Sequence, residues 1–285
     1  MSPFGARLFV ALQYVLPQHL LSRVVYHATR SRIQPVKNAL ISSFMRGFRP
    51  EMSDAEEPDP LRYPSFNAFF TRALRAQARP MPADPRVIAS PVDGTISQIG
   101  PIDGARMIQA KGHDFSVETL LAGPSRWTSR FSSGTFATMY LAPFNYHRIH
   151  MPCNGELHSA WYVPGRLFSV NTTTGAAVPG LFARNERIVC IFEEGELCFA
   201  MVLVGALFVG SMSTVWHGEV TPKIRRRPQP LPVSAGLRLE RGEEMGRFNM
   251  GSTVILLFPR GALEWQREVQ AGTPLRVGQD LARLL

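Results

Sequence analysis

The chain has 285 residues, a length that suits one large domain or two modest ones. Hydrophobic residues make up 45% of it and charged residues 19%, which excludes a disordered chain and a polytopic membrane protein. The net charge of +9 is concentrated in residues 1–50, which hold no acidic residue and seven basic ones: Arg7, Arg23, Arg30, Arg32, Lys37, Arg46 and Arg49. A basic end argues against a nucleic-acid groove across the main domain, so no nucleic-acid partner is expected.

Neither a membrane span nor a disulfide framework is predicted. The longest apolar runs, such as Met201 to Gly210, fall well short of the roughly 18 to 20 residues that cross a bilayer. Cys153, Cys190 and Cys198 cannot all pair and show no C-x-x-C spacing, which favours a reducing compartment.

Three helical segments are predicted in the basic end. The first spans Phe4 to Leu16 and is stopped by Pro17, and the third covers Val36 to Phe44. In the second, apolar side chains recur at helical spacing while basic side chains face the other way. Helices of this kind are typical of an interfacial membrane anchor, and each basic residue near an anionic leaflet adds about 1 kcal/mol. The residues predicted to contact the membrane are Leu20, Leu21, Arg23, Val24, Val25 and Arg30.

Two other interpretations of this basic end stay open. The helices can simply pack on the main domain, or the segment can be a removable organelle-targeting peptide, since such peptides are also rich in arginine and free of acids. A secretory signal is disfavoured, because Gln13 and Gln18 interrupt the apolar stretch and no small-residue cleavage pattern follows.

The acidic, proline-containing segment from Glu51 to Pro60 is predicted to be a solvated linker. The predicted boundary therefore separates a docking region, residues 1–62, from a main domain, residues 63–285. A helix is expected at Ser65 to Leu74, with Ser65 as its N-cap. Strands are expected at Val87 to Ile99, Thr135 to Ala142, Ile188 to Phe192, Leu197 to Val209 and Thr253 to Phe258, with a hairpin turn at Glu194-Gly195. The fold class is therefore α+β: an N-terminal amphipathic helical region followed by a β-rich domain.

Two segments of the main domain carry candidate acid–base groups. Asp93 lies in Ser90-Pro-Val-Asp-Gly94, where an aspartate before glycine is by itself most often a turn residue. A predicted strand leads into a loop that contains proline and ends in His147 and His150. This places the two imidazoles at the surface of the domain, where they can act as bases. Their spacing also allows a metal site with His158 as a distant third ligand, but no carboxylate stands at a familiar ligand spacing.

A third segment, Gly246 to Phe258, contains Gly251-Ser252-Thr253 before a strongly β-forming run. The Gly251 carbonyl has no side chain to shield it, so the Ser252 hydroxyl can attack it in an N-to-O acyl shift that cuts the chain. Taken alone, this tripeptide is most often only the start of a strand.

Together, the three segments make the sequence closely resemble the phosphatidylserine decarboxylase family, pyruvoyl-dependent enzymes of the prokaryotic type that make phosphatidylethanolamine. The resemblance covers nearly the whole chain and includes Phe69 to Arg72, Gln109 to His113, Val163 to Gly165 and Leu181 to Arg187. Met250 stands where the family usually has leucine, which is a volume-conserving replacement.

The resemblance implies roles for individual residues. Asp93, His150 and Ser252 match the family's self-processing triad, in which the aspartate orients the histidine and the histidine takes the serine proton. The chain would then be cut between Gly251 and Ser252, leaving a 1–251 chain and a 252–285 chain that stay associated. His147 matches a family histidine near the pyruvoyl group and is predicted to protonate the product carbon.

The resemblance also implies the cofactor and the partners. Ser252 would become a pyruvoyl group, whose ketone forms a Schiff base with the amino group of phosphatidylserine and accepts the electrons released with carbon dioxide. With only Lys37, Lys111 and Lys223 in the chain, a pyridoxal phosphate site is poorly supplied, and no metal is expected. A diacyl lipid substrate requires work at a bilayer, so we expect a peripheral protein on the cytoplasmic face of the cell membrane, at an anionic surface. The oligomeric state stays open, with a homodimer among the options.

Two rival functions remain for comparison. The first is a Ser/His/Asp hydrolase with an unprocessed Ser252, although the sequence lacks a G-x-S-x-G elbow. The second is a noncatalytic β-rich module with a basic membrane-binding end, which predicts one intact chain and no release of carbon dioxide.

Overall fold

The computed structural model describes residues 3–110, 113–208, 211–221 and 227–285. Lys111, Gly112, Val209, Gly210 and Lys223, which belong to segments named above, lie outside the described residues. The helices are α1 (Pro3–Val15), α2 (Gln18–Arg30), α3 (Gln34–Phe48), the 3-10 helix η1 (Pro60–Arg62), α4 (Phe66–Phe70), α5 (Val117–Leu121), α6 (Ser125–Phe131), α7 (Thr172–Gly175) and α8 (Leu181–Arg184). The three predicted N-terminal helices are confirmed as α1, α2 and α3, with Pro17 at the break between the first two.

No single helix in the described residues is long and apolar enough to cross a bilayer. One pair, Leu8–Val15 with Gln18–Arg30, meets the length and composition requirement only when joined across a bend of 89°.

An aromatic cluster joins α3 to the short helix α4. The Phe44 ring lies 5.3 Å from that of Phe66 and 5.8 Å from that of Phe70, measured between centroids. Ser65 caps α4 as predicted, because its hydroxyl accepts from the Ala68 amide at 3.2 Å. The helix ends at Phe70, however, and not at Leu74.

The early end of α4 has a cause in the segment predicted to be a linker. Leu74 forms an antiparallel bridge with Ala55, and the amide of Glu56 donates to the Ala73 carbonyl at 3.0 Å. This extended pairing cannot coexist with a helix through residue 74. The prediction of a solvated linker from Glu51 to Pro60 is therefore wrong for its middle part, since Ala55 is fully buried.

The main domain is built on a nine-stranded sheet in which Ser252 immediately precedes a central strand. Its path is β12 (Gln229–Leu231), β7 (Gly155–Val163), β8 (Arg187–Glu194), β9 (Leu197–Val204), β15 (Thr253–Phe258), β5 (Thr135–Tyr140), β2 (Gly94–Pro101) and β17 (Pro274–Leu275), with β13 (Arg238–Leu239) also paired to β7. All pairings between these strands are antiparallel. The strand Thr253–Phe258 and the turn at Glu194-Gly195 match their predictions.

Three smaller sheets complete the domain. They are the four-stranded sheet of β11 (Gly218–Val220), β10 (Met212–Thr214), β14 (Glu244–Phe248) and β6 (Arg148–His150), the three-stranded sheet of β1 (Val87–Ala89), β18 (Asp280–Leu284) and β16 (Leu263–Trp265), and the pair β3 (Arg106–Ala110) and β4 (His113–Ser116). The strand expected from Val87 to Ile99 is split into β1 and β2, because Ser90 turns the chain by donating from its hydroxyl to the Val92 carbonyl at 2.8 Å.

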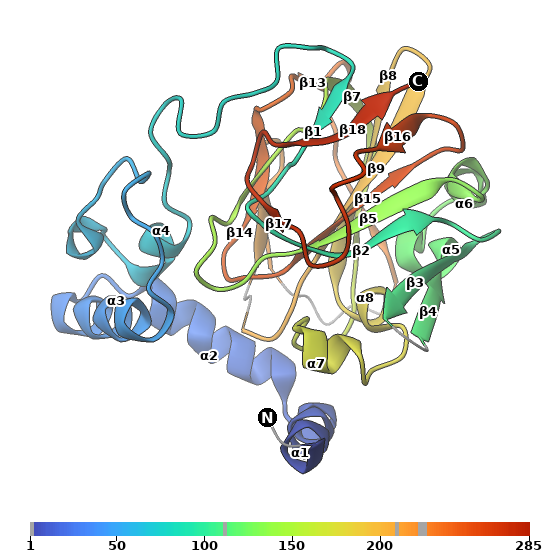
Figure 1. Cartoon of the computed structure of the whole chain (residues 1–285). Helices are drawn as coiled ribbons and strands as arrows, with labels where there is room; N and C mark the ends of the chain where they lie inside the picture. The colour runs from blue at the N-terminus through green and yellow to red at the C-terminus, as the bar shows by residue number, and fades with distance from the viewer. Residues whose placement is uncertain (1–2, 111–112, 209–210, 222–226) are drawn as a thin grey trace.

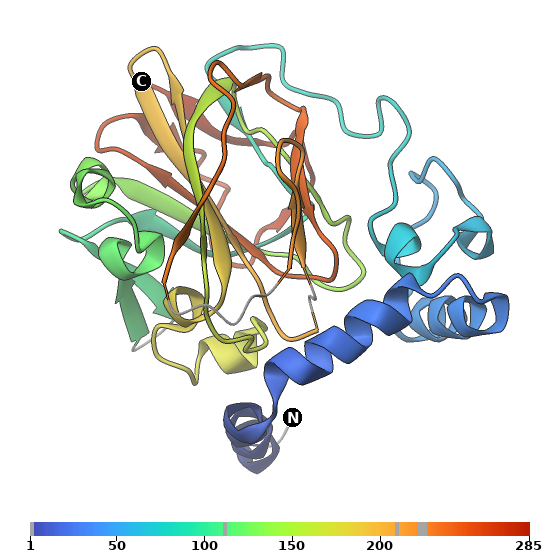
Figure 2. The same cartoon turned by 180° about the vertical axis from the view of Figure 1, so that it is seen from behind.

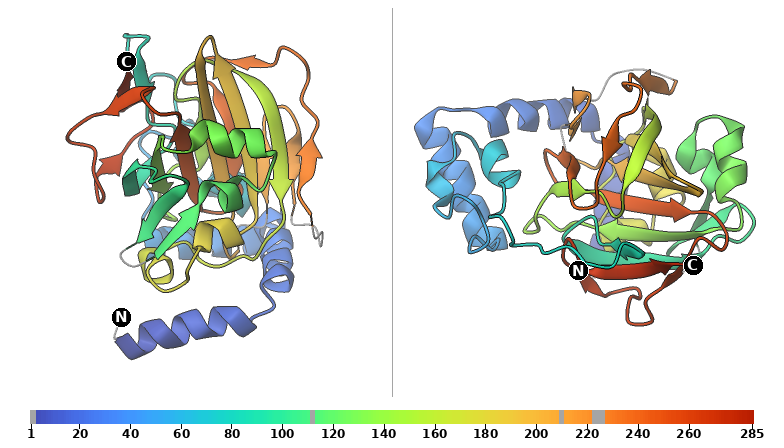
Figure 3. Two further views of the ribbon diagram at one scale, coloured as in Figure 1. Left: turned by 90° about the vertical axis from the view of Figure 1, so that its right-hand side faces the viewer. Right: turned by 90° about the horizontal axis from the view of Figure 1, so that it is seen from above.

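The sheets roll around one hydrophobic core (Figure 1). The N-terminal helices lie along one side of this β body, and the C-terminus lies on the opposite side (Figure 2). Seen from above, α3 and α4 stand apart from the β body, and α2 runs from them along one edge of it (Figure 3, right). The fold thus places a helical layer beside the end of the sheet where β15 begins.

Candidate active site

Gly251 and Ser252 lie where the chain enters β15. The backbone of Ser252 is held in place because its carbonyl accepts from the Leu141 amide at 2.9 Å. Its hydroxyl accepts from the Thr253 amide at 2.5 Å, and the whole residue is buried. From Thr253 onwards, β15 pairs with β5 on one side and with β9 on the other. The predicted cleavage site therefore lies immediately before β15, a strand whose residues are all buried.

His147 lies directly against this cleavage site. A Cβ atom placed on Gly251 would come within 3.2 Å of the His147 Nε2, so a larger residue at this position would press on the imidazole. The His147 ring packs at 4.1 Å on that of Phe70 and is fully buried. Neither ring nitrogen makes a hydrogen bond of normal geometry within the described residues.

Burial also sets the charge of this imidazole. Desolvation, and then the nearby charge of Arg72, lower the pKa of His147 to about 3, against a smaller opposing effect of the Asn145 backbone. His147 is therefore neutral beside the peptide that is predicted to be cut, with one ring nitrogen protonated and the other free to accept.

His150 is engaged elsewhere in the uncut chain. Its Nδ1 lies 2.7 Å from the Gly242 carbonyl, which only accepts, so Nδ1 carries the proton. Its Nε2 lies 2.9 Å from the Tyr146 hydroxyl, which then donates to it. The two rings also stack, and burial lowers the pKa of His150. The basic nitrogen of His150 is thus occupied by Tyr146.

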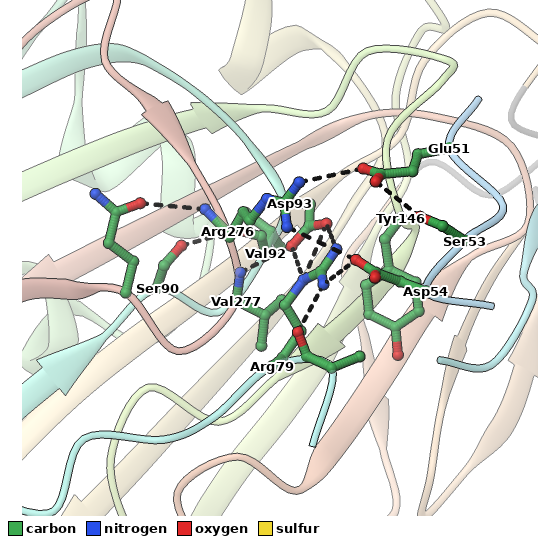
Figure 4. A network of polar contacts seen from close by, with 12 residues as sticks. Glu51, Ser53, Asp54, Arg79, Ser90, Val92, Asp93, Tyr146, Arg276 and Val277 are labelled. Atoms are coloured by element: carbon green, nitrogen blue, oxygen red, sulfur yellow. Dashed lines mark hydrogen bonds and ion pairs between the residues drawn. The ribbon is translucent and has the colours of Figure 1, made fainter. Parts of the chain in front are cut away.

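Asp93 is held by a cation and by a backbone amide (Figure 4). Arg79 donates to its carboxylate from Nε at 3.0 Å and from Nη2 at 2.6 Å, and the Val277 amide donates at 2.8 Å. Arg79 also donates to Asp54 at 2.7 Å. This network ties the turn before β2 both to the segment after α3 and to the C-terminal part of the chain.

The structure brings the segments of Asp93 and His150 together, but it does not join Asp93, His150 and Ser252 into a hydrogen-bonded triad. Within the described residues, no hydrogen bond links Asp93 to His150 or His150 to Ser252, because Arg79 and Tyr146 occupy the relevant atoms. The segments do touch, since the His150 amide donates to the Pro91 carbonyl at 2.9 Å. The charge of Asp93 also acts on His150, in the direction that favours its protonated form. The assignment of roles stays a prediction.

Sequence reasoning missed the partners of these groups. Tyr146 stands next to His147 in the sequence, so an aromatic hydroxyl beside a base was a visible signal. Phe70 is predicted to lie on the apolar face of the Ser65–Leu74 helix and belongs to a shared segment, but neither pattern indicates packing on His147. Arg79 lies in a stretch of alanines and prolines with no periodicity, and nothing in that pattern indicates an ion pair with Asp93.

An apolar cavity reaches the cleavage site from the helical layer. Its volume is about 300 Å³, and its lining includes Phe44 and Phe48 of α3, Phe70 of α4, and Met250 and Gly251. A second cavity, of about 510 Å³, is charged and is lined by Asp93, Arg79 and Tyr146 among others. Both cavities border the loop that carries His147, because Leu141 and Pro143 line the first and Asn145 and Tyr146 line the second.

The histidines do not gather as metal ligands in the parts of the chain that the structure describes. His158 lies on β7 with its ring against that of Trp127, while His147 and His150 face Gly251 and Gly242. No group of three or more His, Cys, Asp or Glu side chains able to hold a metal ion occurs among the described residues.

Comparison with known proteins shows the family of this chain. A family model described as phosphatidylserine decarboxylase matches residues 66–283, and a second, described as PSD, matches residues 8–49. The chain is 48% identical over 278 residues to the phosphatidylserine decarboxylase proenzyme of Pseudomonas fluorescens, covering 96% of each chain. It is 49% identical over 277 residues to that of Bordetella avium (97% and 94% covered) and 48% identical over 282 residues to that of Methylococcus capsulatus (99% and 98% covered). The chain belongs to the phosphatidylserine decarboxylase family.

Proposed function

We propose that the chain is a self-cleaving phosphatidylserine decarboxylase, which makes phosphatidylethanolamine and carbon dioxide in phospholipid biosynthesis. One observation carries the proposal: the Gly251–Ser252 peptide lies between a neutral, buried His147 and an apolar cavity that opens towards α3. A lipid substrate requires such an apolar approach, and a proton transfer requires such an imidazole.

The residues at the cleavage site fit a pyruvoyl group made from Ser252. Gly251 leaves room for the imidazole of His147, which a larger residue would crowd, and the burial of Ser252 keeps bulk water away. The pyruvoyl ketone would supply the electron sink, through a Schiff base with the amino group of the lipid. His147 would hold a proton beside the reacting carbon and deliver it after carbon dioxide leaves.

Self-cleavage is assigned to Ser252, His150 and Asp93. The Ser252 hydroxyl attacks the Gly251 carbonyl, and the Nε2 of His150 takes the hydroxyl proton after leaving the Tyr146 hydroxyl. Asp93, fixed by Arg79 and Val277, stabilises the resulting imidazolium by its charge. A hydrolase with an intact Ser252 is less well supported, because the hydroxyl is buried and accepts from the Thr253 amide.

The two products of the cut are expected to remain one protein. The 252–285 chain would contain β15, which pairs with β5 and β9 of the larger chain. It would also keep the Val277 amide on Asp93. Loss of the 252–285 chain would remove β15, a central strand, from the sheet.

Peripheral attachment to an anionic membrane, at the cytoplasmic face, is the third part of the proposal. On α2 the polar residues Gln18, Ser22 and Thr29 are buried, while Leu20 and Val24 are 58% and 60% exposed. A helix that only packed on the domain would bury its apolar side instead. Arg30, predicted to face lipid, forms an ion pair with Glu219 and is better assigned to holding α2 on the domain.

The test is the intact mass of the purified protein. We expect two chains, with the smaller one beginning at a blocked residue 252 that reacts as a ketone. Ser252→Ala should yield one uncut, inactive chain, because it removes both the attacking oxygen and the precursor of the ketone. An uncut Ser252→Ala protein with full decarboxylase activity would overturn the proposal.

A further inference from the structure

Glu186 is a buried acid with an unused oxygen, in the turn between α8 and β8. The residue is fully buried. Its Oε2 accepts from the Tyr162 hydroxyl at 3.0 Å, but its Oε1 has no hydrogen-bond partner within the described residues. A buried polar atom without a partner costs about 1–3 kcal/mol. A purely structural role therefore accounts for Oε2, which accepts from Tyr162, but not for Oε1.

The sheet places Glu186 in the same cross-strand row as Ser252. Val204 of β9 lies opposite Arg187 of β8 and Thr253 of β15. One residue further along, Gly205 therefore stands between Glu186 and Ser252. The Gly205 amide donates to the Glu186 carbonyl at 2.8 Å, which keeps this row in register. Neighbours in one row point to the same face of a sheet.

The middle residue of the row is a glycine, and the acid occupies the space above it. A Cβ atom on Gly205 would come within 2.9 Å of the Glu186 Cγ and within 3.1 Å of its Oε1. The carboxyl group thus lies over the strand next to β15, about one strand spacing of 4.8 Å from the Ser252 side chain.

The residues on both sides of Glu186 hold it rigidly. The Asn185 side chain donates to the carbonyls of Phe168 and Gly205, each at 2.8 Å. The guanidinium of Arg187 points to the other side of the sheet, where it donates to the carbonyls of Leu120 and Thr119, both at 2.6 Å. The backbone that carries the Glu186 side chain is therefore anchored on both sides.

Glu186 also keeps its proton. Burial raises the pKa of Glu186 to about 7, with the bond from Tyr162 opposing the shift. Among the described residues, Glu186 contacts the Tyr162 hydroxyl from β7 and Gly205 after β9, and the register puts Ser252 next in the row; none of these groups is charged. Near neutral pH the row therefore contains a carboxylic acid and not only a carboxylate.

Pyruvoyl formation, on which this inference rests, needs such an acid. After the acyl shift, the ester to Gly251 eliminates: the Cα proton leaves, the Cβ–O bond breaks, and Gly251 departs as a carboxylate. Residue 252 is then an enamine, with a CH₂ carbon in place of the serine Cβ. Becoming a methyl ketone requires a new C–H bond at that carbon.

We propose that the carboxyl group of Glu186 donates this proton, from across Gly205 to the former Cβ of residue 252. The enamine becomes an iminium ion and Glu186 a carboxylate. Water then adds to the iminium carbon, and the adduct collapses to the ketone and an ammonium ion. That ion returns a proton to Glu186 and leaves as ammonia. One enamine and one water thus give one ketone and one ammonia.

The test separates chain cleavage from ketone formation. Freshly made precursor is allowed to cut itself, and samples taken over time are analysed for the mass of the 252–285 chain and for labelling by a carbonyl reagent. In the parent protein both should rise together. In Glu186→Gln the cut should proceed, while labelling lags behind it by about a hundredfold, the usual contribution of a positioned acid.

Two variants serve as controls. Glu186→Asp keeps a carboxyl group and should restore part of the labelling rate, whereas Tyr162→Phe removes the other hydrogen bond and should leave cutting and labelling together. In the parent, labelling should slow as the pH rises above about 7, because Glu186 loses its proton, and Glu186→Gln should lack this dependence.

Each other outcome contradicts the assignment. Labelling that keeps pace with cutting in Glu186→Gln would show that another group delivers the proton. If the Glu186→Gln chain stays uncut, Glu186 is needed for folding or for the cleavage itself, and the assignment is wrong whether or not Glu186→Asp is cut. A parent chain that is never cut would instead refute the proposed function.

Discussion

At the scale of single residues, burial decides what each acid–base group of the site can do. His147 is neutral because it has lost its water and lies near Arg72. His150 is also shifted towards its neutral form by burial, but its Nε2 lies against a hydroxyl that can move away. The two imidazoles therefore differ in their hydrogen-bond partners, although they are only three residues apart. This difference suits His147 for turnover and His150 for maturation.

The first residue-scale prediction is a separation of these two roles. Asp93→Asn and His150→Ala should leave an uncut precursor, since a lost base or orienting carboxylate costs about 10⁴ in rate. His147→Ala should still be cut, at least partly, yet decarboxylate poorly. Gel analysis and carbon dioxide release measure the two outcomes, and normal maturation of all three variants would refute the division of roles.

The second residue-scale prediction concerns stability against pH. The pKa of His147 is about 3 in the folded chain and near 6.5 in the unfolded chain, so between these values the unfolded state binds the extra proton. The folded precursor should therefore lose stability as the pH falls below about 6.5, by at most about 1.4 kcal/mol per pH unit from this group.

Urea unfolding at several pH values would measure this effect in the uncut Ser252→Ala protein, with Ser252→Ala/His147→Asn for comparison. The second protein should lose less stability on acidification. Equal losses in the two proteins would mean that His147 is already protonated in the folded state.

At the scale of elements, a charged network connects three segments that are far apart in the chain. Arg79 joins Asp54, after α3, to Asp93, before β2, and Asp93 also accepts from Val277, before β18. The Arg79 and Asp93 side chains are only 11% and 10% exposed, so their pairing is screened less than an ion pair at the surface.

This network gives the element-scale prediction. Arg79→Gln should destabilise the uncut Ser252→Ala protein by about 3 kcal/mol, because it leaves a buried carboxylate without its cation. Arg276→Gln is the control for an exposed cation of the same network: its side chain is 61% exposed and pairs with Glu51 and Asp54, so its loss should cost less than about 1 kcal/mol. Similar small effects of both changes would show that Asp93 does not depend on Arg79.

Local patterns were enough to predict several of these elements. Apolar spacing and Pro17 located the three N-terminal helices, and the run after Ser252 located β15 to the residue. The helix at Ser65 was predicted too long, because the pairing of Leu74 with Ala55 is a tertiary contact that leaves no periodic signal. For the same reason Asp93, His150 and Ser252 were found by resemblance, whereas the contacts made by Arg79 and Tyr146 were not.

At the scale of the whole molecule, the helical layer presents apolar side chains to its surroundings. Leu20 and Val24 of α2 are exposed, and so are Leu8, Leu12 and Val15 of α1. Polar side chains attach the same helices to the β body: Gln13 and Gln18 accept from the Ser169 and Leu167 amides at 2.7 and 2.9 Å. The layer is thus fixed to the domain by hydrogen bonds and leaves its apolar side uncovered.

Vesicle flotation tests the membrane part of the proposal. Leu20→Asp with Val24→Asp should weaken binding to neutral and anionic vesicles alike, because it removes apolar area worth roughly 25 cal/mol per Å². Ile108→Asp, which changes an equally exposed apolar residue on β3, should not. Arg23→Gln should weaken binding to anionic vesicles only, and less so at high salt.

Self-cleavage should survive these changes, because Ser252 lies in the β body. Equal flotation of the parent and the Leu20/Val24 variant would favour helices that serve only to cover the domain.

Cleavage before Ser252, as proposed, would make folding of this protein a one-way process because of the position of β15. The strand can enter between β5 and β9 while it is still covalently joined to residue 251, when its arrival is an intramolecular event. Once the bond is cut, a denatured protein must bring two separate chains back together, at a rate that falls with dilution. The mature form should therefore owe its persistence to slow unfolding rather than to reversible equilibrium, and lifetime at a given temperature is the fitting measure of its stability.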